Sequence, residues 1–484
     1  MISFLISLVV LLAGYFVYGK FVERVFSPDN RTTPAIRLAD GVDYMVLPTW
    51  KIFMIQFLNI AGTGPIFGAI MGAKFGPSCY LWIVLGCVFA GATHDYLSGM
   101  LSMRNDGMGW PNLIGKYLGT KMQKMMLLFS VLLLMLVGAV FVYSPAEILH
   151  SIGGPTLMWV LIIFAYYFIA TMLPIDKIIG RIYPLFAISL LFMAGALLCV
   201  LVFKFPSLPE FWDGLGNKAL TVDPSWKDTL FPCLFITVAC GAISGFHATQ
   251  TPLMARCMAS EHKGRPIFYG AMITEGIVAL IWATVSSYFF YASPTPGSQL
   301  IDTPLSAGFI TSAPKVAYII CNDWLGLVGG LLALLGIVAA PITSGDTALR
   351  SARLCIAEFF HFDQKSISKR LYVSIPLFVL TILLLVWQIE NPDGFKTIWQ
   401  YFGWANQTMS VVTLWMLSVY LAHKRKPYII ALIPAVFMTM VCSSFFLVSH
   451  QMLHLEGTLG YSVASLFTIV VTGVFFKKAV CSRK

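Results

Sequence analysis

Apolar segments of about twenty residues recur from one end of this chain to the other. A helix needs about 20 apolar residues to cross the hydrocarbon core of a bilayer. Only 11% of the 484 residues are charged, against about 25% in a soluble domain. We therefore predict an all-α polytopic membrane protein with about 13 transmembrane helices. The predicted spans are 2–20, 51–74, 79–103, 125–143, 156–174, 182–203, 229–256, 266–292, 325–345, 371–388, 400–421, 427–448 and 458–476.

Two of these spans contain a break. The run from Trp50 to Phe75 is interrupted at Ala61–Pro65, and the run from Phe231 to Met258 is interrupted at Cys240–His247. Unwound backbone at bilayer depth leaves N–H and C=O groups without partners, so it is tolerated only where protein covers it or where it lines a cavity. Paired breaks in two halves of a chain are typical of secondary transporters, whose binding site lies near the midplane.

Each break opens a set of five predicted helices. Because five is an odd number, the second set starts on the opposite side of the membrane, which gives an inverted repeat. One predicted helix precedes the two sets and two follow them. The predicted parts are 1–49 (first helix and cytoplasmic loop), 50–203 (first repeat), 204–228 (extracellular or periplasmic loop), 229–421 (second repeat) and 422–484 (two C-terminal helices).

The basic residues set the predicted orientation. With the N-terminus outside and the C-terminus in the cytoplasm, most of the 32 Lys and Arg residues fall in inside loops, as the positive-inside rule requires. We therefore expect a multi-pass protein of the cell (inner) membrane. Topology explains most of the net charge of +10, and it favours contact with anionic lipid rather than nucleic acid. The sequence does not specify an oligomeric state.

The ten cysteines are scattered, mostly within apolar runs, and none form a C-x-x-C pair. This pattern favours small buried hydrophobic groups over a disulfide framework or a thiolate metal site. We expect no cofactor and no enzymatic activity. A membrane-embedded metalloenzyme built on His94, Asp95 and His247 is a weak alternative, because no H-E-x-x-H or comparable ligand spacing is present.

The two breaks form the predicted substrate site. A half-helix that begins inside the membrane presents free N–H groups and a partial positive charge, which suit a carboxylate. Glycine also lets the backbone approach a ligand closely. The alternative is that the small residues only allow close packing of helices. The predicted substrate-binding residues are Asn59, Gly62, Thr63, Gly64, Gly241, Ser244, Gly245 and His247.

Ionisable residues inside the predicted spans are candidates for proton coupling. His94 and Asp95 lie in the third span, and Glu275 lies near the middle of the eighth. A charge at bilayer depth costs at least about 2.5–3.5 kcal/mol, so each of these residues needs a partner or a function. A histidine beside a carboxylate can carry a proton near neutral pH. Alternatively, His94 and Asp95 cap helix contacts and His247 makes one structural hydrogen bond.

A third group of residues would suit Na⁺. Ala340, Thr343 and Ser344 lie within about one turn near the inner end of the ninth span and offer hard oxygen ligands. The alternative is that the two hydroxyls bond back to their own helix. The coupling ion is therefore open between H⁺ and Na⁺. Asp346 precedes Arg350 by four residues, which predicts an ion pair on a helix surface.

Across about residues 35–420 the chain carries five motifs in order: Asn59–Ile66, Phe89–Tyr96, Ala239–Ala248, Thr343–Arg350 and Phe402–Gln407. With these motifs it resembles the carbon-starvation (CstA) family of membrane transporters. The resemblance implies the LeuT-like 5+5 fold of the amino acid–polyamine–organocation superfamily. It also implies a substrate held by the two broken helices, and a cation site between the first broken helix and the eighth core helix.

The family is linked to uptake of pyruvate and short peptides during nutrient limitation. We therefore predict a symporter that imports a small carboxylate nutrient by alternating access, with pyruvate as the first candidate and di- or tripeptides or amino acids as the second. Asn59 and Thr63 depart from the small residues of the family pattern beside the predicted site. A membrane nutrient sensor is the alternative from another class, and a channel is a weaker one.

Overall fold

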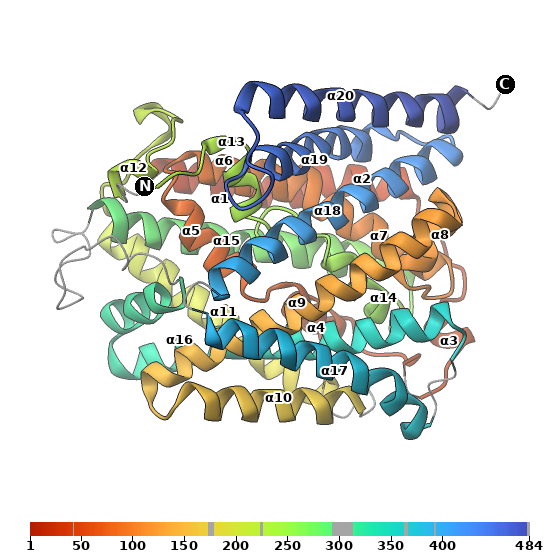
Figure 1. Cartoon of the computed structure of the whole chain (residues 1–484), viewed down its shortest axis with the longest axis horizontal. Coiled ribbons are helices and arrows are strands. Elements are labelled where there is room, and N and C mark those ends of the chain that lie inside the picture. Colours follow the sequence, from red (N-terminus) through yellow and green to blue (C-terminus); the bar gives the residue numbers. More distant parts are fainter. Residues whose placement is uncertain are drawn as a thin grey trace.

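The computed structural model describes residues 1–41, 43–172, 179–222, 226–292, 313–362, 366–391 and 394–481. Within these ranges the regular structure is entirely helical, and most long helices run along one common direction (Figure 1). The N-terminal part comprises α1 (Ile2–Phe16), α2 (Tyr18–Phe26) and α3 (Pro34–Arg37).

The first repeat begins with the broken helix and ends with a long apolar helix. Its elements are α4 (Thr49–Ile60), η1 (Gly64–Gly68), α5 (Ala69–Ala73), α6 (Ser78–Leu85), η2 (Gly86–Gly91), α7 (Ala92–Arg104), α8 (Trp110–Leu118), α9 (Thr120–Ile152), α10 (Thr156–Met172) and α11 (Ile179–Lys204).

The second repeat follows a loop that contains η3 (Phe211–Asp213) and α12 (Ala219–Val222). Two more helices, α19 (Ile429–Val448) and α20 (Gly457–Phe475), and the turn η8 (Phe476–Val480) end the described chain. The elements of the repeat are α13 (Leu230–Thr237), α14 (His247–Ala255), η4 (Glu261–Lys263), η5 (Arg265–Tyr269), α15 (Gly270–Ser287), η6 (Tyr288–Ala292), α16 (Ala313–Phe359), α17 (Ile367–Glu390) and α18 (Gly394–His423).

Over its described residues, every predicted span coincides with a helix or with a run of consecutive helices, and the last two residues of the span 156–174 lie outside the described ranges. By length and hydropathy alone, nine of the described helical segments could cross a membrane, or up to ten if the bent pair α4 and η1–α5 is one span. The helix α10 is apolar but shorter, with 17 residues. The chain is thus a multi-pass, all-helical membrane protein.

Both predicted breaks are present. After α4 the chain makes an inverse γ-turn at Ala61 (φ −78°, ψ 61°), closed by a 2.9 Å hydrogen bond from the Gly62 N–H to the Ile60 carbonyl. The helix resumes at Gly64 after a bend of 55°. After α13 the chain leaves the helix at Val238 with similar angles (φ −91°, ψ 64°). The matching backbone at the two breaks agrees with an internal repeat.

The packing brings the two breaks into contact. The helix α14 packs against α4 and α7, while α15 packs against α4 and α5. A Cβ atom added to Gly64 would lie 2.3 Å from the Cys240 side chain, and one added to Gly241 would lie 3.8 Å from the Pro65 Cα. Gly64 therefore allows one broken helix to touch the other, as the close-packing alternative requires, whereas Gly241 makes room for the Ala279 side chain of α15, 2.5 Å from an added Cβ.

The two ends of the bundle carry the groups predicted for opposite sides of the membrane. At one end the Met1 ammonium pairs with Glu210 in the loop after α11, and both were predicted outside. At the other end Arg104 binds Glu261, and the Lys426 ammonium donates to the Phe26 carbonyl. The N-terminus and α3 lie at these opposite ends (Figure 1). Which end faces the cytoplasm stays a prediction from charge.

Candidate functional site

Four buried ionisable side chains gather where α7, α14 and α15 meet. The Asp95 carboxylate accepts a hydrogen bond from Nδ1 of His94 at one oxygen and from Nδ1 of His247 at the other, each 2.8 Å long. Nε2 of His247 lies 3.5 Å from Oε2 of Glu275. All four side chains are fully buried. The sequence named all four residues, and the tertiary structure joins them in the order Glu275, His247, Asp95, His94, here called the relay.

The local structure explains how the relay is assembled. The π-helical turn η2 directly precedes α7, and such turns are frequent at functional sites. His247 is the first residue of α14, so it stands at the end of the second break. The relay therefore links an unwound segment to two neighbouring helices.

The hydrogen bonds determine what the relay can do chemically. Because each Nδ1 faces a carboxylate oxygen, each imidazole carries its proton there and leaves Nε2 as the acceptor. Nε2 of His94, Nε2 of His247 and both oxygens of Glu275 have no hydrogen-bond partner in the described structure. The arrangement therefore places an acceptor nitrogen of His247 next to the Glu275 carboxyl group.

Two residues at the first break offer unsatisfied polar atoms. Asn59 and Thr63 are fully buried, and the amide atoms of Asn59 and the hydroxyl of Thr63 have no partner among the described residues. Buried polar groups are normally hydrogen-bonded, so these groups are suited to a ligand or to water. The Gly62 N–H, by contrast, is already bonded to Ile60.

The second break is held by α18. Oδ1 of Asn406 accepts hydrogen bonds from the Ser244 hydroxyl (3.0 Å) and the Phe246 N–H (2.7 Å), and the Asn406 carbonyl accepts from the Gly245 N–H (3.2 Å). Nε2 of Gln407 donates to the Ile243 carbonyl (2.8 Å). The Gly245 N–H is therefore occupied in this conformation and not free for a carboxylate. Residue-based reasoning missed the role of Asn406 and Gln407, although they stood in a recognised motif.

The comparison with known families identifies the chain. The family model described as carbon starvation protein CstA matches residues 1–158, 144–312 and 316–444. The chain belongs to the CstA family.

Its relatives within and around that family include named transporters. The chain is 45% identical over 357 residues to an uncharacterized membrane protein of Haemophilus influenzae, covering 64% of this chain and 95% of that protein. It is 26% identical over 568 residues to the peptide transporter CstA of Escherichia coli, covering 90% and 79%. It is also 26% identical over 580 residues to the pyruvate/proton symporter BtsT of Escherichia coli, covering 91% and 80%.

Solved structures confirm the fold expected of this CstA-family member. A manganese transporter of Eremococcus coleocola matches with a TM-score of 0.58 at 12% identity, over 91% of this chain and 97% of that one. MhsT in complex with L-phenylalanine matches with a TM-score of 0.56 at 12% identity, over 87% and 99%. The LeuT-like fold is therefore shown, and the named relatives support secondary transport.

The candidate Na⁺ ligands of this CstA-family chain make other bonds. The Thr343 hydroxyl donates to the Ala339 and Ala340 carbonyls (3.0 and 2.9 Å), which is the back-bonding alternative. The Ser344 hydroxyl donates to the Leu58 carbonyl (3.0 Å) and so ties α16 to the first broken helix. Within the described ranges, no group of three or more His, Cys, Asp or Glu side chains is arranged to hold a metal ion.

The predicted surface pair of Asp346 and Arg350 is wrong, because neither residue lies on a surface. Both are buried, and α16 is packed against α9, α10, α11 and α17. Oδ2 of Asp346 accepts a hydrogen bond from the Tyr183 hydroxyl (2.8 Å), and Nη2 of Arg350 donates to the Ala170 carbonyl (2.6 Å). A charge pattern along one helix cannot reveal how many neighbours surround that helix.

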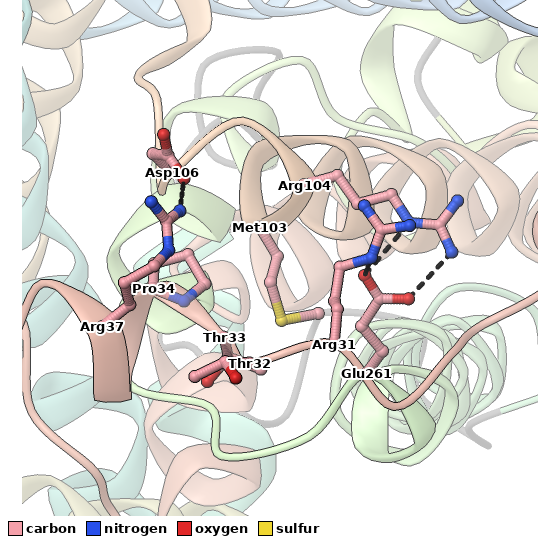
Figure 2. A pocket seen from close by; sticks show the side chains of 9 residues that line it. All are labelled: Arg31, Thr32, Thr33, Pro34, Arg37, Met103, Arg104, Asp106 and Glu261. Atoms are coloured by element: carbon pink, nitrogen blue, oxygen red, sulfur yellow. Dashed lines mark hydrogen bonds and ion pairs between the residues drawn. The ribbon is translucent and has the colours of Figure 1, made fainter.

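A cavity of about 230 Å³ lies at the predicted cytoplasmic end (Figure 2). The Arg31 and Arg104 guanidinium groups both approach the buried Glu261 carboxylate, with Nη2 of Arg104 at 2.8 Å and Nε of Arg31 at 3.4 Å. Arg37 pairs with Asp106 beside them. These ion pairs join the segment after α2 to the end of α7 and to η4, and so hold this end of the bundle together.

The same arginines affect an exposed carboxylate nearby. Hydrogen bonds from the Arg31 side chain and backbone hold the pKa of Asp29 well below its usual range. Asp29 therefore stays ionised further into the acid range than an ordinary aspartate and adds a negative charge beside Arg31 and Arg104.

Proposed function

We propose that this chain is a proton-coupled secondary transporter that imports a small carboxylate-bearing nutrient, with pyruvate as the first candidate. The observation that carries the proposal is the buried relay of His94, Asp95, His247 and Glu275 at the end of the second break. Four ionisable groups in a bilayer are costly unless they act together. An alternating-access cycle would use them to couple proton movement to the breaks.

The relay suggests how coupling would work. A proton delivered to Glu275 and passed to His247 converts a neutral imidazole into a cation between two carboxylates. The attraction between His247 and Asp95 then strengthens, because the hydrogen bond to the carboxylate becomes an ion pair between two full charges of opposite sign. Because His247 begins α14, this change acts directly on the second break. Release of the proton on the other side would reverse it.

The choice of substrate rests on both the breaks and the relatives. Pyruvate is supported by the name of BtsT, a pyruvate/proton symporter. Di- or tripeptides and amino acids are the second candidate, supported by the relatives named peptide transporter CstA. The side-chain amide of Asn59 also supports them, because it has no partner in the described structure and is able both to donate and to accept hydrogen bonds. Under either proposal the chain is a transporter and not an enzyme. A nutrient sensor remains the alternative from another class.

We also propose H⁺ rather than Na⁺ as the coupling ion. The Thr343 hydroxyl bonds back to its own helix, whereas the relay has nitrogen and oxygen atoms without hydrogen-bond partners in the described structure. The protein would lie in the inner membrane with the N-terminus outside and the C-terminus in the cytoplasm. Its partners would be the small-molecule substrate and membrane lipid.

The test is uptake of radiolabelled pyruvate into proteoliposomes under an imposed pH gradient, an Na⁺ gradient, or no gradient. Accumulation that only the pH gradient drives is the expected result. Unlabelled dipeptides are added as competitors, and labelled dipeptide is measured in the same vesicles. Accumulation driven by Na⁺ alone would overturn proton coupling. Uptake of neither solute under any gradient would overturn transport and favour the sensor.

A further inference from the structure

A second cluster of buried charge, at the predicted cytoplasmic end of α16, contains none of the relay residues. Arg353 is only 1% exposed, and its Nε and Nη1 atoms have no hydrogen-bond partner in the part of the chain that is described. It stands seven residues after Asp346 and three after Arg350, so all three lie on one face of the helix. Arg370, near the start of α17, is also buried.

The two neighbouring arginines already donate hydrogen bonds to backbone carbonyls. Nη2 of Arg350 donates to the Ala170 carbonyl (2.6 Å), and Nη1 of Arg370 donates to the Met172 carbonyl (2.8 Å). These carbonyls belong to the last turn of α10, where the helix dipole favours positive charge. Arg350 and Arg370 therefore help to cap α10, and Arg353 is the additional cation.

The charges that face Arg353 do not neutralise it directly. Arg350 and Arg370 repel it, while Asp43 and Asp346 attract it. No ion pair within 4.0 Å joins Arg353 to a described acidic group, and Oδ2 of Asp346 is bonded to Tyr183. A buried cation without a partner is strongly unfavourable, because it has lost its hydration and gained nothing in exchange.

We propose that Arg353 is the centre of an oxyanion-binding site that takes a carboxylate or a phosphate group. A guanidinium offers a planar fork of N–H donors that matches these two anions. The site lies about 9 Å from the end of α16, since six residues separate Arg353 from Phe359. An anion there would compensate the excess positive charge. This site shares no residue with the relay and does not depend on the proposed substrate.

The test is the melting temperature of the purified full-length protein in detergent, titrated with phosphate, acetate or pyruvate against chloride at equal ionic strength. We expect a saturable rise with phosphate or with the carboxylates. In Arg353→Met the apparent affinity should fall about tenfold or more, as expected for loss of a charged hydrogen-bonding partner. Without oxyanion, this variant should melt no lower than the wild type, because the substitution removes a buried charge that has no ion pair within the described residues.

Arg265→Met is the matched control, because Arg265 is paired with Glu23 at 2.8 Å. This variant should melt lower and keep the wild-type oxyanion response. Arg353→Lys, which keeps the charge but loses the fork, should bind oxyanions more weakly than the wild type and provides a second variant if Arg353→Met does not fold. Equilibrium binding of labelled phosphate or acetate to the wild type measures the site without any variant.

Comparing the titrations with different anions also distinguishes the possible sources of the bound anion. A response to phosphate alone assigns the site to phosphate groups, and repeating the titration with a short-chain phosphatidic acid shows whether a lipid headgroup supplies them. A response to acetate assigns it to carboxylates. A pyruvate response that survives Arg353→Met belongs to the substrate site. The proposal is overturned if no oxyanion shifts the wild type, or if Arg353→Met keeps the full wild-type response.

Discussion

Replacing the two carboxylates of the relay by their amides should have unequal effects on stability but the same effect on coupling. Asp95 accepts two 2.8 Å hydrogen bonds from buried imidazoles. Hydrogen bonds to a charged group contribute about 1.5–3 kcal/mol each. In Asp95→Asn one oxygen remains as an acceptor, while the new NH₂ group faces an N–H donor. We therefore expect a loss of about 2–4 kcal/mol of stability.

Glu275→Gln should behave differently. Both oxygens of Glu275 lack hydrogen-bond partners in the described structure, and Oε2 lies 3.5 Å from Nε2 of His247. The amide has the same shape and removes a group that would be costly to ionise when buried. The stability of Glu275→Gln should therefore stay within about 1 kcal/mol of the wild type.

Two measurements on the same preparations test this reasoning. Thermal unfolding in detergent compares the stabilities, and pyruvate uptake into proteoliposomes compares accumulation with and without a pH gradient. Both variants should lose gradient-driven accumulation, and Glu275→Gln should retain exchange of internal for external substrate. The reasoning is refuted if Glu275→Gln still accumulates substrate in response to the pH gradient, or if Asp95→Asn is as stable as the wild type.

Three further predictions concern other parts of the chain. Asn406→Ala removes the acceptor of the 2.7 Å bond from the Phe246 N–H, so unfolding measurements should show a loss of about 1–3 kcal/mol, with slower uptake. Gly62→Leu places its Cβ about 2.8 Å from the Phe141 ring, which should abolish uptake while size-exclusion chromatography still shows folded protein. Burial opposes ionisation of Glu210, yet hydrogen bonds from the N-terminal amine and from the first residues of α1 hold its pKa below the usual 4.5. The contact should therefore be intact above pH 4.5 and weaken as the pH falls through the lower pKa of the folded state, with faster hydrogen exchange in α1.

Much of the architecture follows from one-dimensional patterns. A span needs a stretch of apolar residues of fixed length, and a break needs residues that leave the helix, so both are visible as strings of residue types. This is why the predicted spans and the breaks at Ala61 and Val238 could be located within a few residues. Charge at bilayer depth is equally visible, because it is rare there, and it singled out His94, Asp95 and Glu275 before any contact was known.

Only the tertiary structure decided which of these residues meet. Asp95 and His247 are 152 positions apart and become partners because α14 packs against α7. Asn406 holds the second break from a helix that the residue pattern did not connect to it. Asp346, read as a surface residue from its spacing, is enclosed by neighbouring helices. Hydropathy and helical spacing depend on residues close in sequence, whereas burial and hydrogen bonding depend on which helices become neighbours, and that is a property of the whole fold.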